Sequence, residues 1–316
     1  MNSRGGQQGS GPPIYVGPDG QFGSEAAGSV REAVECGGGR VVSEPKEVEA
    51  IVWLGSPSGL SEVLHESVRW VQLPSAGVES WLESGAIDDR RVFTSAVGAY
   101  SATVAEHALA LMLAGARRLH ECARATEWEE RWGRLFAGST VVILGAGGIG
   151  RALIELLEPF DNRILAVTRS GRDVPGATES HAAKDTDELW PRGDFFVVAA
   201  PATSATQHLI GAEELEAMQY HAWVVNVARG SLVDTDALVE ALAAGSIGGA
   251  GLDVTDPEPL PEGHPLWTEP RALITPHSAN PPDALVRRLK ERVEENVSRY
   301  VAGEELIGVI DVEAGY

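Results

Sequence analysis

The residues best suited to catalysis in this chain are Arg229, Glu258 and His277, each of which stands shortly after a run of apolar residues. A guanidinium group can bind a carboxylate through two parallel hydrogen bonds. An imidazole can give or take the proton of a hydroxyl or carbonyl group near neutral pH. A neighbouring glutamate orients such a ring and favours its protonated form. Together the three side chains indicate acid–base chemistry on a substrate that carries a carboxylate.

Taken singly, each of these residues has a simpler interpretation. Arg229 could be a surface cation, Glu258 an acid in a turn and His277 a capped core imidazole. However, ligands of open α/β sheets bind beyond the carboxyl ends of the strands, and all three residues follow predicted strands. We therefore expect them to share one site.

A glycine-rich loop upstream predicts a dinucleotide site. The loop follows the apolar run 140–144 and opens a predicted helix over 151–157, which is the order that such a site requires. Gly145 permits a tight turn, Gly147 lets a pyrophosphate approach the backbone, and Gly150 lets the helix pack close to the strand. Methyltransferases use a similar loop, so the motif alone does not specify hydride transfer. The loop residues expected to contact the cofactor are Gly145, Gly147, Gly148, Ile149 and Gly150.

The end of the next strand bears on which dinucleotide binds. An NAD site places Asp or Glu about 20 residues after the glycine loop, on the ribose 2′-hydroxyl. Here the end of the next strand and the turn after it, residues 166–172, contain no acid, and the first one is Asp173. Two arginines could pair with a 2′-phosphate, and a serine could donate a hydrogen bond to it. We predict a preference for NADP(H), with NAD also usable; the alternative is a solvated surface turn. The residues concerned are Thr168, Arg169, Ser170 and Arg172.

The elements that must position these residues form an α/β fold. Six apolar runs without alternation predict strands that are covered on both faces, hence a parallel sheet between helices. That is the strand count of a doubly wound Rossmann domain. The runs are 140–144, 164–167, 195–199, 223–227, 249–252 and 272–274.

The first part of the chain predicts a second α/β layer. Short apolar strands over 14–16, 50–54, 70–72 and 91–94 alternate with helical stretches. A nearly continuous apolar helix over 102–118 should be buried on most sides, as between two domains, with Thr103 and Glu106 in capping-box spacing.

The last helix, over 283–302, repeats an apolar residue at every fourth position from Leu285 to Val301 and meets Gly303 where a cap belongs. It could return to the first domain and make it discontinuous. We expect a lead-in over 1–13, a substrate domain over 14–101 and 284–316, and a dinucleotide-binding domain over 102–283.

Composition narrows the classes of partner and compartment. The 316 residues include 25 Lys and Arg against 46 Asp and Glu, a net charge of −21, which argues against binding nucleic acid or anionic membranes. Two distant cysteines indicate a reducing compartment, and no apolar stretch resembles a secretory signal or a membrane span, so we expect a cytoplasmic protein. The histidines show no metal-ligand spacing, so no metal is expected; His107 we assign to packing.

The ordered motifs of nearly the whole chain after the lead-in resemble the D-isomer-specific D-2-hydroxyacid dehydrogenase family. The family implies reversible hydride transfer between NAD(P)H and a 2-oxo acid, a flavodoxin-like substrate domain beside the Rossmann domain, and a homodimer. The matching segments are 72–78, 104–107, 145–150, 226–230, 251–254 with 258–259, and 275–277.

The resemblance also implies roles for single residues. Arg229 would bind the carboxylate and carbonyl of the substrate, His277 would be the acid–base group and Glu258 its partner. The backbone amides of Ala76 and Gly77 would hold the carboxylate from the other domain. The residues expected to contact the cofactor outside the glycine and arginine segments are Ala200, Thr206, Val227 and, at the nicotinamide carboxamide, Asp253.

Departures from the family pattern narrow the range of possible substrates. Residues 54–58 lack the cation of phosphoglycerate-type members, which favours a small monocarboxylate such as glyoxylate or hydroxypyruvate. Thr168 and Arg169 replace the usual acid, as in some glyoxylate/hydroxypyruvate reductase-like members. Tyr100 resembles the corresponding residue of lactate-type members. It would either line the pocket or pack at an interface. The alternative function is an NADP(H)-sensing binding or co-regulator protein of the same fold.

Overall fold

The chain forms two compact units, which we describe separately. The computed structural model describes residues 11–19 and 22–315. The first unit comprises Met1–Tyr100 and Pro282–Tyr316, and the second comprises Ser101–Pro281. Within the described residues, no helix has the length and apolar character needed to cross a membrane.

The second unit is built on a seven-stranded parallel sheet. Its strands are β6 (Thr140–Leu144), β7 (Arg163–Thr168), β8 (Glu179–Ala182), β9 (Phe195–Val198), β10 (Trp223–Asn226), β11 (Gly249–Leu252) and β12 (Ala272–Ile274). They lie in the order β12-β11-β10-β9-β6-β7-β8. This is the doubly wound Rossmann order with one further strand beyond the sixth, so the predicted fold class is confirmed.

The winding of this sheet reverses between β6 and β9. The two strands are hydrogen-bonded neighbours, although the chain forms β7 and β8 between them. Ligands of such sheets bind beyond the carboxyl ends of the strands at this point. The glycine loop follows β6 and Ala200 follows β9, so the fold brings both to the expected binding edge.

All six predicted strands of this unit are present, but β8 was missed. It is an edge strand that pairs with β7 alone, and its four residues, Glu-Ser-His-Ala, are half-buried. An edge strand covered on fewer sides needs no continuous apolar run, so the pattern that revealed the other strands is absent here.

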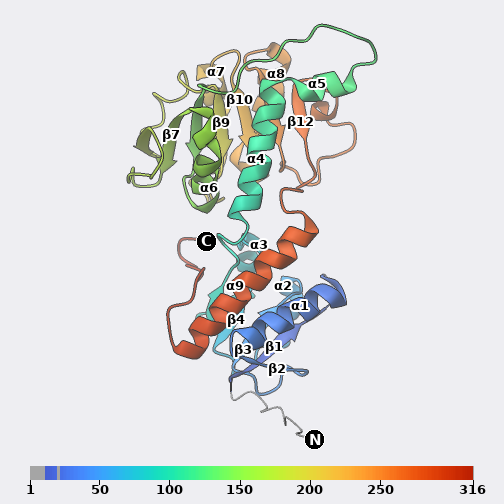
Figure 1. Ribbon diagram of the computed structural model, residues 1–316, viewed down its shortest axis with the longest axis vertical. Coiled ribbons are helices and arrows are strands. Elements are labelled where there is room, and N and C mark those ends of the chain that lie inside the picture. Colours follow the sequence, from blue (N-terminus) through green and yellow to red (C-terminus); the bar gives the residue numbers. More distant parts are fainter. Residues whose placement is uncertain (1–10, 20–21, 316) are drawn as a thin grey trace, which may run out of the picture. The chain divides into compact units, whose positions relative to one another are not determined.

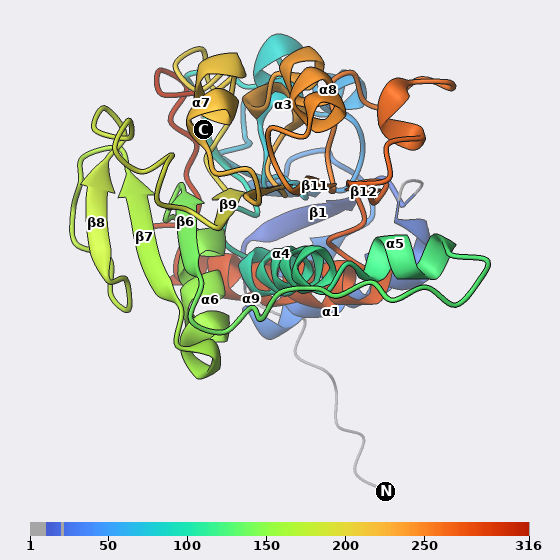
Figure 2. The ribbon, with the colours of Figure 1, turned by 90° about the horizontal axis from the view of Figure 1, so that it is seen from above.

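Helices cover both faces of the sheet: α4 and α6 lie on one face and α7 and α8 on the other (Figure 2). Apolar residues of α4 are buried against α6, β10 and β11, which explains its nearly continuous apolar sequence. The helices and 3-10 turns are α4 (Ser101–Ala116), α5 (Leu119–Arg124), α6 (Gly148–Leu157), η1 (Glu158–Phe160), α7 (Ala212–Ala217), η2 (Gly230–Leu232), α8 (Thr235–Ala244) and η3 (Pro265–Trp267).

The capping-box expectation for α4 was wrong. The helix already begins at Ser101, so Thr103 is its third residue rather than its cap. The Thr103 hydroxyl is instead hydrogen-bonded to the side chain of Asn280, downstream of β12.

The first unit contains a five-stranded parallel sheet in the order β2-β1-β3-β4-β5, which is the flavodoxin-like order. Strand β2 was missed for the same reason as β8, because it is a short edge strand with exposed and half-buried residues. Positions 1–10 of the predicted lead-in lie outside the described residues, and its last residue already belongs to β1. The elements are β1 (Pro13–Gly17), α1 (Gly23–Cys36), β2 (Arg40–Val42), β3 (Ala50–Trp53), α2 (Pro57–Leu60), β4 (Trp70–Gln72), α3 (Glu79–Glu83), β5 (Val92–Thr94) and α9 (Pro282–Ala302).

Helix α9 packs along α1, so the last helix belongs to the first unit (Figure 1). Leu289, Val293 and Val297 are buried as the periodicity predicts, whereas Val301 in the last turn is 48% exposed and lines an open pocket. Asn296 is also buried; its amide nitrogen donates to Oε1 of Gln72 and to a main-chain carbonyl. This polar anchor interrupts the apolar pattern, and the helical periodicity gave no sign of it.

Candidate active site

Glu258 and His277 form a hydrogen-bonded pair beyond the carboxyl ends of two adjacent strands. Glu258 lies in the segment after β11, and His277 follows β12. Nδ1 of His277 lies 2.7 Å from Oε1 of Glu258. Both side chains remain accessible, at 53% and 43% exposure. Because Nδ1 is engaged by the carboxylate, Nε2 is the ring nitrogen left for proton transfer with a ligand.

Arg229 stands on a rigid turn after β10, the strand beside β11. Asn226 at the end of the strand is buried; its amide nitrogen donates to the carbonyl of Arg229 at 2.8 Å, and its Oδ1 accepts from the amide of Ala228 at 3.1 Å. Gly230 packs so tightly that a Cβ atom there would lie 2.0 Å from the carbonyl oxygen of Thr255. These contacts fix the backbone that presents the half-buried Arg229, and Asn226 is a supporting residue that was not among the predicted site residues.

The loop that carries His277 is anchored on Asp253, at the end of β11. The carboxylate is 1% exposed. Its Oδ1 accepts hydrogen bonds from the Thr275 hydroxyl and the Ser278 amide, and its Oδ2 accepts one from the Ala279 amide. Burial opposes ionisation of Asp253, but hydrogen bonds from the His107 and Thr275 side chains and the Ser278 amide outweigh it and lower the pKa to about 2.

The glycine loop has the shape that a dinucleotide requires. Gly145 has φ +102°, and a Cβ atom on it would lie 2.5 Å from the amide nitrogen of Ala200. A Cβ atom on Gly150 would lie 2.7 Å from the carbonyl oxygen of Gly145. Gly147, by contrast, is exposed and has open space on its Cβ side. The loop is therefore closed toward the sheet and open where a pyrophosphate would approach. The amides of Gly148, Ile149 and Gly150, in the first turn of α6, follow directly after it.

The segment after β7 presents the residues assigned to the 2′-phosphate. Arg169, Ser170 and Arg172 are exposed, and Gly171 between them has φ +73°. Oγ1 of Thr168, the last residue of the strand, is buried and has no hydrogen-bond partner in the described chain. A ligand that reaches this turn would meet hydroxyl and guanidinium groups.

The other predicted cofactor residues occupy the same sheet edge. Ala200 is half-buried beside Gly145, and Val227 is 6% exposed after β10. The Thr206 hydroxyl donates to the carbonyl of Pro201 at 2.8 Å and accepts from the amide of Thr203 at 2.9 Å, so it shapes its own loop.

The predicted substrate residues of the first unit lie on a braced turn. Among the described residues, the amides of Ala76 and Gly77 have no acceptor, which leaves them available to a carboxylate. The buried Tyr100 hydroxyl donates to the carbonyl of Pro74 at 2.6 Å, and burial raises its pKa. Tyr100 therefore braces the turn through a hydrogen bond within the first unit.

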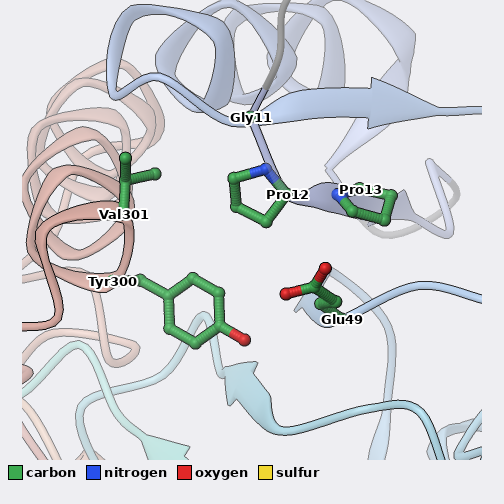
Figure 3. Close-up of a pocket in the computed structure, with 6 residues that line it drawn as sticks. All are labelled: Gly11, Pro12, Pro13, Glu49, Tyr300 and Val301. Atoms are coloured by element: carbon green, nitrogen blue, oxygen red, sulfur yellow. The ribbon is translucent and has the colours of Figure 1, made fainter.

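A separate open pocket of about 490 Å³ lies on the first unit, where Tyr300 and Glu49 face Pro12 and Pro13 (Figure 3). None of the predicted site residues lines it. Within the described chain, no group of three His, Cys, Asp or Glu side chains is placed to hold a metal ion.

Comparison with known proteins agrees with this geometry. Residues 109–279 match the model of the D-isomer specific 2-hydroxyacid dehydrogenase, NAD binding domain. An uncharacterised protein from the proB 3′ region of Corynebacterium melassecola is 39% identical over 297 residues, which cover 91% of this chain and 96% of that protein.

Two named reductases are also similar. The human glyoxylate reductase/hydroxypyruvate reductase is 40% identical over 55% of this chain and 56% of its own length. The NADPH-dependent glyoxylate/hydroxypyruvate reductase of Sinorhizobium meliloti, solved with NADP and sulfate, is 26% identical with a TM-score of 0.80, over 96% of this chain and all of that one. By its family match and its fold, the chain belongs to the D-isomer specific 2-hydroxyacid dehydrogenase family, and it is an oxidoreductase with a nicotinamide-dinucleotide domain.

Proposed function

We propose that the chain is an NADP(H)-dependent reductase of small 2-oxo monocarboxylic acids, of the glyoxylate and hydroxypyruvate type. The observation that carries this proposal is the His277–Glu258 pair, accessible to solvent at the end of β12, two strands from the Arg229 turn. An imidazole and a guanidinium at one sheet edge provide the proton and the anion site that a 2-oxo acid needs.

The nicotinamide cofactor, held by the glycine loop and the first turn of α6, would supply or accept the hydride. Residues of this chain would do the rest. Arg229 binds the carboxylate and polarises the carbonyl, and Nε2 of His277 donates a proton to the carbonyl oxygen on reduction or removes it on oxidation. Glu258 orients the ring and stabilises its protonated form. In the first unit, the amides of Ala76 and Gly77 would bind a carboxylate.

The preference for NADP(H) rests on the turn after β7. Arg169 and Arg172 offer cations, Ser170 offers a donor, and no carboxylate lies between the end of β7 and Asp173. A 2′-phosphate carries a charge that such groups bind strongly, whereas an NAD site places an acid at this turn. The NADP complex of the Sinorhizobium reductase adds support by analogy.

The preference for a small substrate with one carboxylate rests on residues 54–58. Leu54 and Gly55 are buried, and no Lys or Arg occurs in the segment. A second anionic group on the substrate would lack a counter-charge there. A reducing compartment such as the cytoplasm suits the two free, exposed cysteines Cys36 and Cys122.

We also propose that the protein is a homodimer, joined through the segment after α5. Large apolar side chains rarely stand strongly exposed close together in one segment of a monomer, and apolar patches mark interfaces. The exposed set, which we call the apolar arm, is Trp128 (98%), Trp132 (80%) and Leu135 (78%).

The deciding experiment is oxidation of NADPH measured with a panel of 2-oxo acids, including glyoxylate, hydroxypyruvate, pyruvate and phosphohydroxypyruvate. We expect turnover with the small monocarboxylates, and a loss of about 10²- to 10⁴-fold in kcat for His277→Ala. Tight NADPH binding without turnover of any acid would instead support an NADP(H)-sensing protein. Full activity in His277→Ala would remove the assigned acid–base group.

A further inference from the structure

We propose that His107, Thr275 and Asp253 form a network of hydrogen bonds that holds the loop 275–280, which carries His277. His107 is then a positioning residue for His277. This inference rests on the proposed function for its kinetic consequence, but its structural part does not depend on the substrate. The predicted role of His107 is packing, but its hydrogen bond from α4 to the loop after β12 indicates a further one.

The loop places His277 in a conformation that needs support. His277 has φ +51°, in the left-handed region that residues with a Cβ atom rarely adopt. Its amide donates to the main-chain carbonyl oxygens of Asp253, at 2.8 Å, and Thr275, at 3.0 Å. The conformation therefore depends on the contacts of the loop with β11, because the residue itself does not favour it.

Asp253 supplies most of those contacts. Its side chain accepts from Thr275 Oγ1 at 2.6 Å, from the Ser278 amide at 2.8 Å and from the Ala279 amide at 3.1 Å. Together with its carbonyl oxygen, this one residue binds donors on both sides of His277 and the amide of His277 itself. A buried carboxylate with so many donors can shift only if several hydrogen bonds break together.

His107 connects this anchor to α4. Its Nε2 atom lies 2.9 Å from Thr275 Oγ1 and 3.3 Å from Asp253 Oδ1. Since the Thr275 hydroxyl donates its proton to Asp253, it can accept one from His107, so the three side chains form a directed chain of hydrogen bonds. One turn earlier on the same helix, Thr103 is hydrogen-bonded to Asn280 at the far end of the loop.

His107 thus reaches His277 only through Thr275 and Asp253, which makes it a positioning residue rather than a catalytic one. Removing its donor would leave the hydrogen-bonded pair of Thr275 and the buried Asp253 with one bond fewer and would loosen the loop. A displacement of the imidazole by a fraction of an ångström lowers the rate of proton transfer more than it weakens ground-state binding.

The test compares His107→Leu, which removes the donor, with His107→Gln, whose Nε2 can still donate to Thr275. For His107→Leu we expect kcat for 2-oxo acid reduction to fall about tenfold or more, with KM for the acid changed less than about threefold. Amide hydrogen exchange over 275–280 should accelerate in the same variant. His107→Gln should recover most of both properties, and Glu106→Gln, on the exposed side of α4, should leave both unchanged.

Wild-type kcat and exchange in His107→Leu would overturn the inference, as would equal losses in the Leu and Gln variants, which would show that only ring volume matters. If His107→Leu does not fold, Thr275→Val and Thr275→Ser provide the same comparison, because only Ser keeps the hydroxyl. If the wild-type protein reduces no 2-oxo acid, the proposed function fails, while exchange over 275–280 still decides whether His107 holds the loop.

Discussion

The Nδ1 atom of His277 lies 2.7 Å from Oε1 of Glu258, across the carboxyl ends of β11 and β12. The contact selects one ring nitrogen for the carboxylate and leaves the other for a ligand. Nineteen residues separate the two side chains in sequence, and the loops after two adjacent parallel strands bring them together.

The charge of Glu258 should contribute to proton transfer by His277. Glu258→Gln keeps the shape and a hydrogen bond but removes the charge that stabilises the protonated ring. We expect kcat to fall about tenfold or more, since a charge-assisted hydrogen bond is about twice as strong as a neutral one. Steady-state kinetics with NADPH and glyoxylate would measure the effect. Glu262→Gln, an exposed glutamate in the same segment, is the matched control and should behave as wild type.

Two glycines of the phosphate loop should respond to alanine in opposite ways. Gly145→Ala introduces a Cβ atom 2.5 Å from the Ala200 nitrogen at φ +102°, so the folded protein should be destabilised by about 2 kcal/mol or more. Gly147→Ala meets open space and should unfold at the wild-type denaturant midpoint. Its Kd for NADPH should nevertheless rise at least tenfold, because the new methyl group occupies the approach of the pyrophosphate. Unchanged NADPH affinity in Gly147→Ala would contradict the assigned binding mode.

The lowered pKa of Asp253 predicts a pH-dependent stability. The pKa is about 2 in the folded protein against an ordinary value of 3.8. A lowered pKa stabilises the fold above the unfolded value, here by about 2 kcal/mol, and this contribution is lost as pH falls toward 2. The difference in unfolding free energy between wild type and Asp253→Asn should therefore be largest at pH 6 and smaller by about 1 kcal/mol at pH 3. Urea denaturation at the two values measures it, and a pH-independent difference would refute the linkage.

Cofactor selectivity should depend on the two arginines after β7. In Arg169→Ala/Arg172→Ala, kcat/KM for NADPH should fall about tenfold or more, while the value for NADH should change little. The preference of the wild-type protein should also weaken at high salt, because exposed charges are screened. Arg40→Ala/Arg90→Ala removes the same net charge from exposed positions of the first unit. This control should leave the ratio of kcat/KM for NADPH to kcat/KM for NADH unchanged. Equal losses with both cofactors would remove the 2′-phosphate role.

The apolar arm should control the oligomeric state. Trp128→Glu/Trp132→Glu should convert the dimer to monomers, because each tryptophan would lose about 200 Å² of buried contact and bring a charge into the interface. Sedimentation velocity at several concentrations would show the change. Tyr220→Glu, at another strongly exposed aromatic position, is the control and should stay dimeric. A monomeric wild-type protein would refute the proposed dimer.

Local sequence patterns were sufficient to predict the fold class and the position of most strands. The glycine loop between an apolar run and a helix predicted the Rossmann unit, and solid apolar runs located the six central strands because residues of a covered parallel strand are apolar on both faces. The same patterns failed at the edge strands β2 and β8, which have one strand neighbour and tolerate polar residues. At Val301, helical periodicity continued past the point where α1 and the sheet could cover it.

The sequence identified the catalytic residues of the candidate site, whereas the tertiary structure decided their contacts. Residue types identified Arg229, Glu258 and His277, because few side chains can bind a carboxylate or exchange a proton near neutral pH. The sequence could not show that Glu258 contacts Nδ1 of His277, that Tyr100 braces the Pro74 turn, or that His107 joins Asp253 through Thr275. These contacts span up to 168 residues, so only the packing of helix and strand ends decides them.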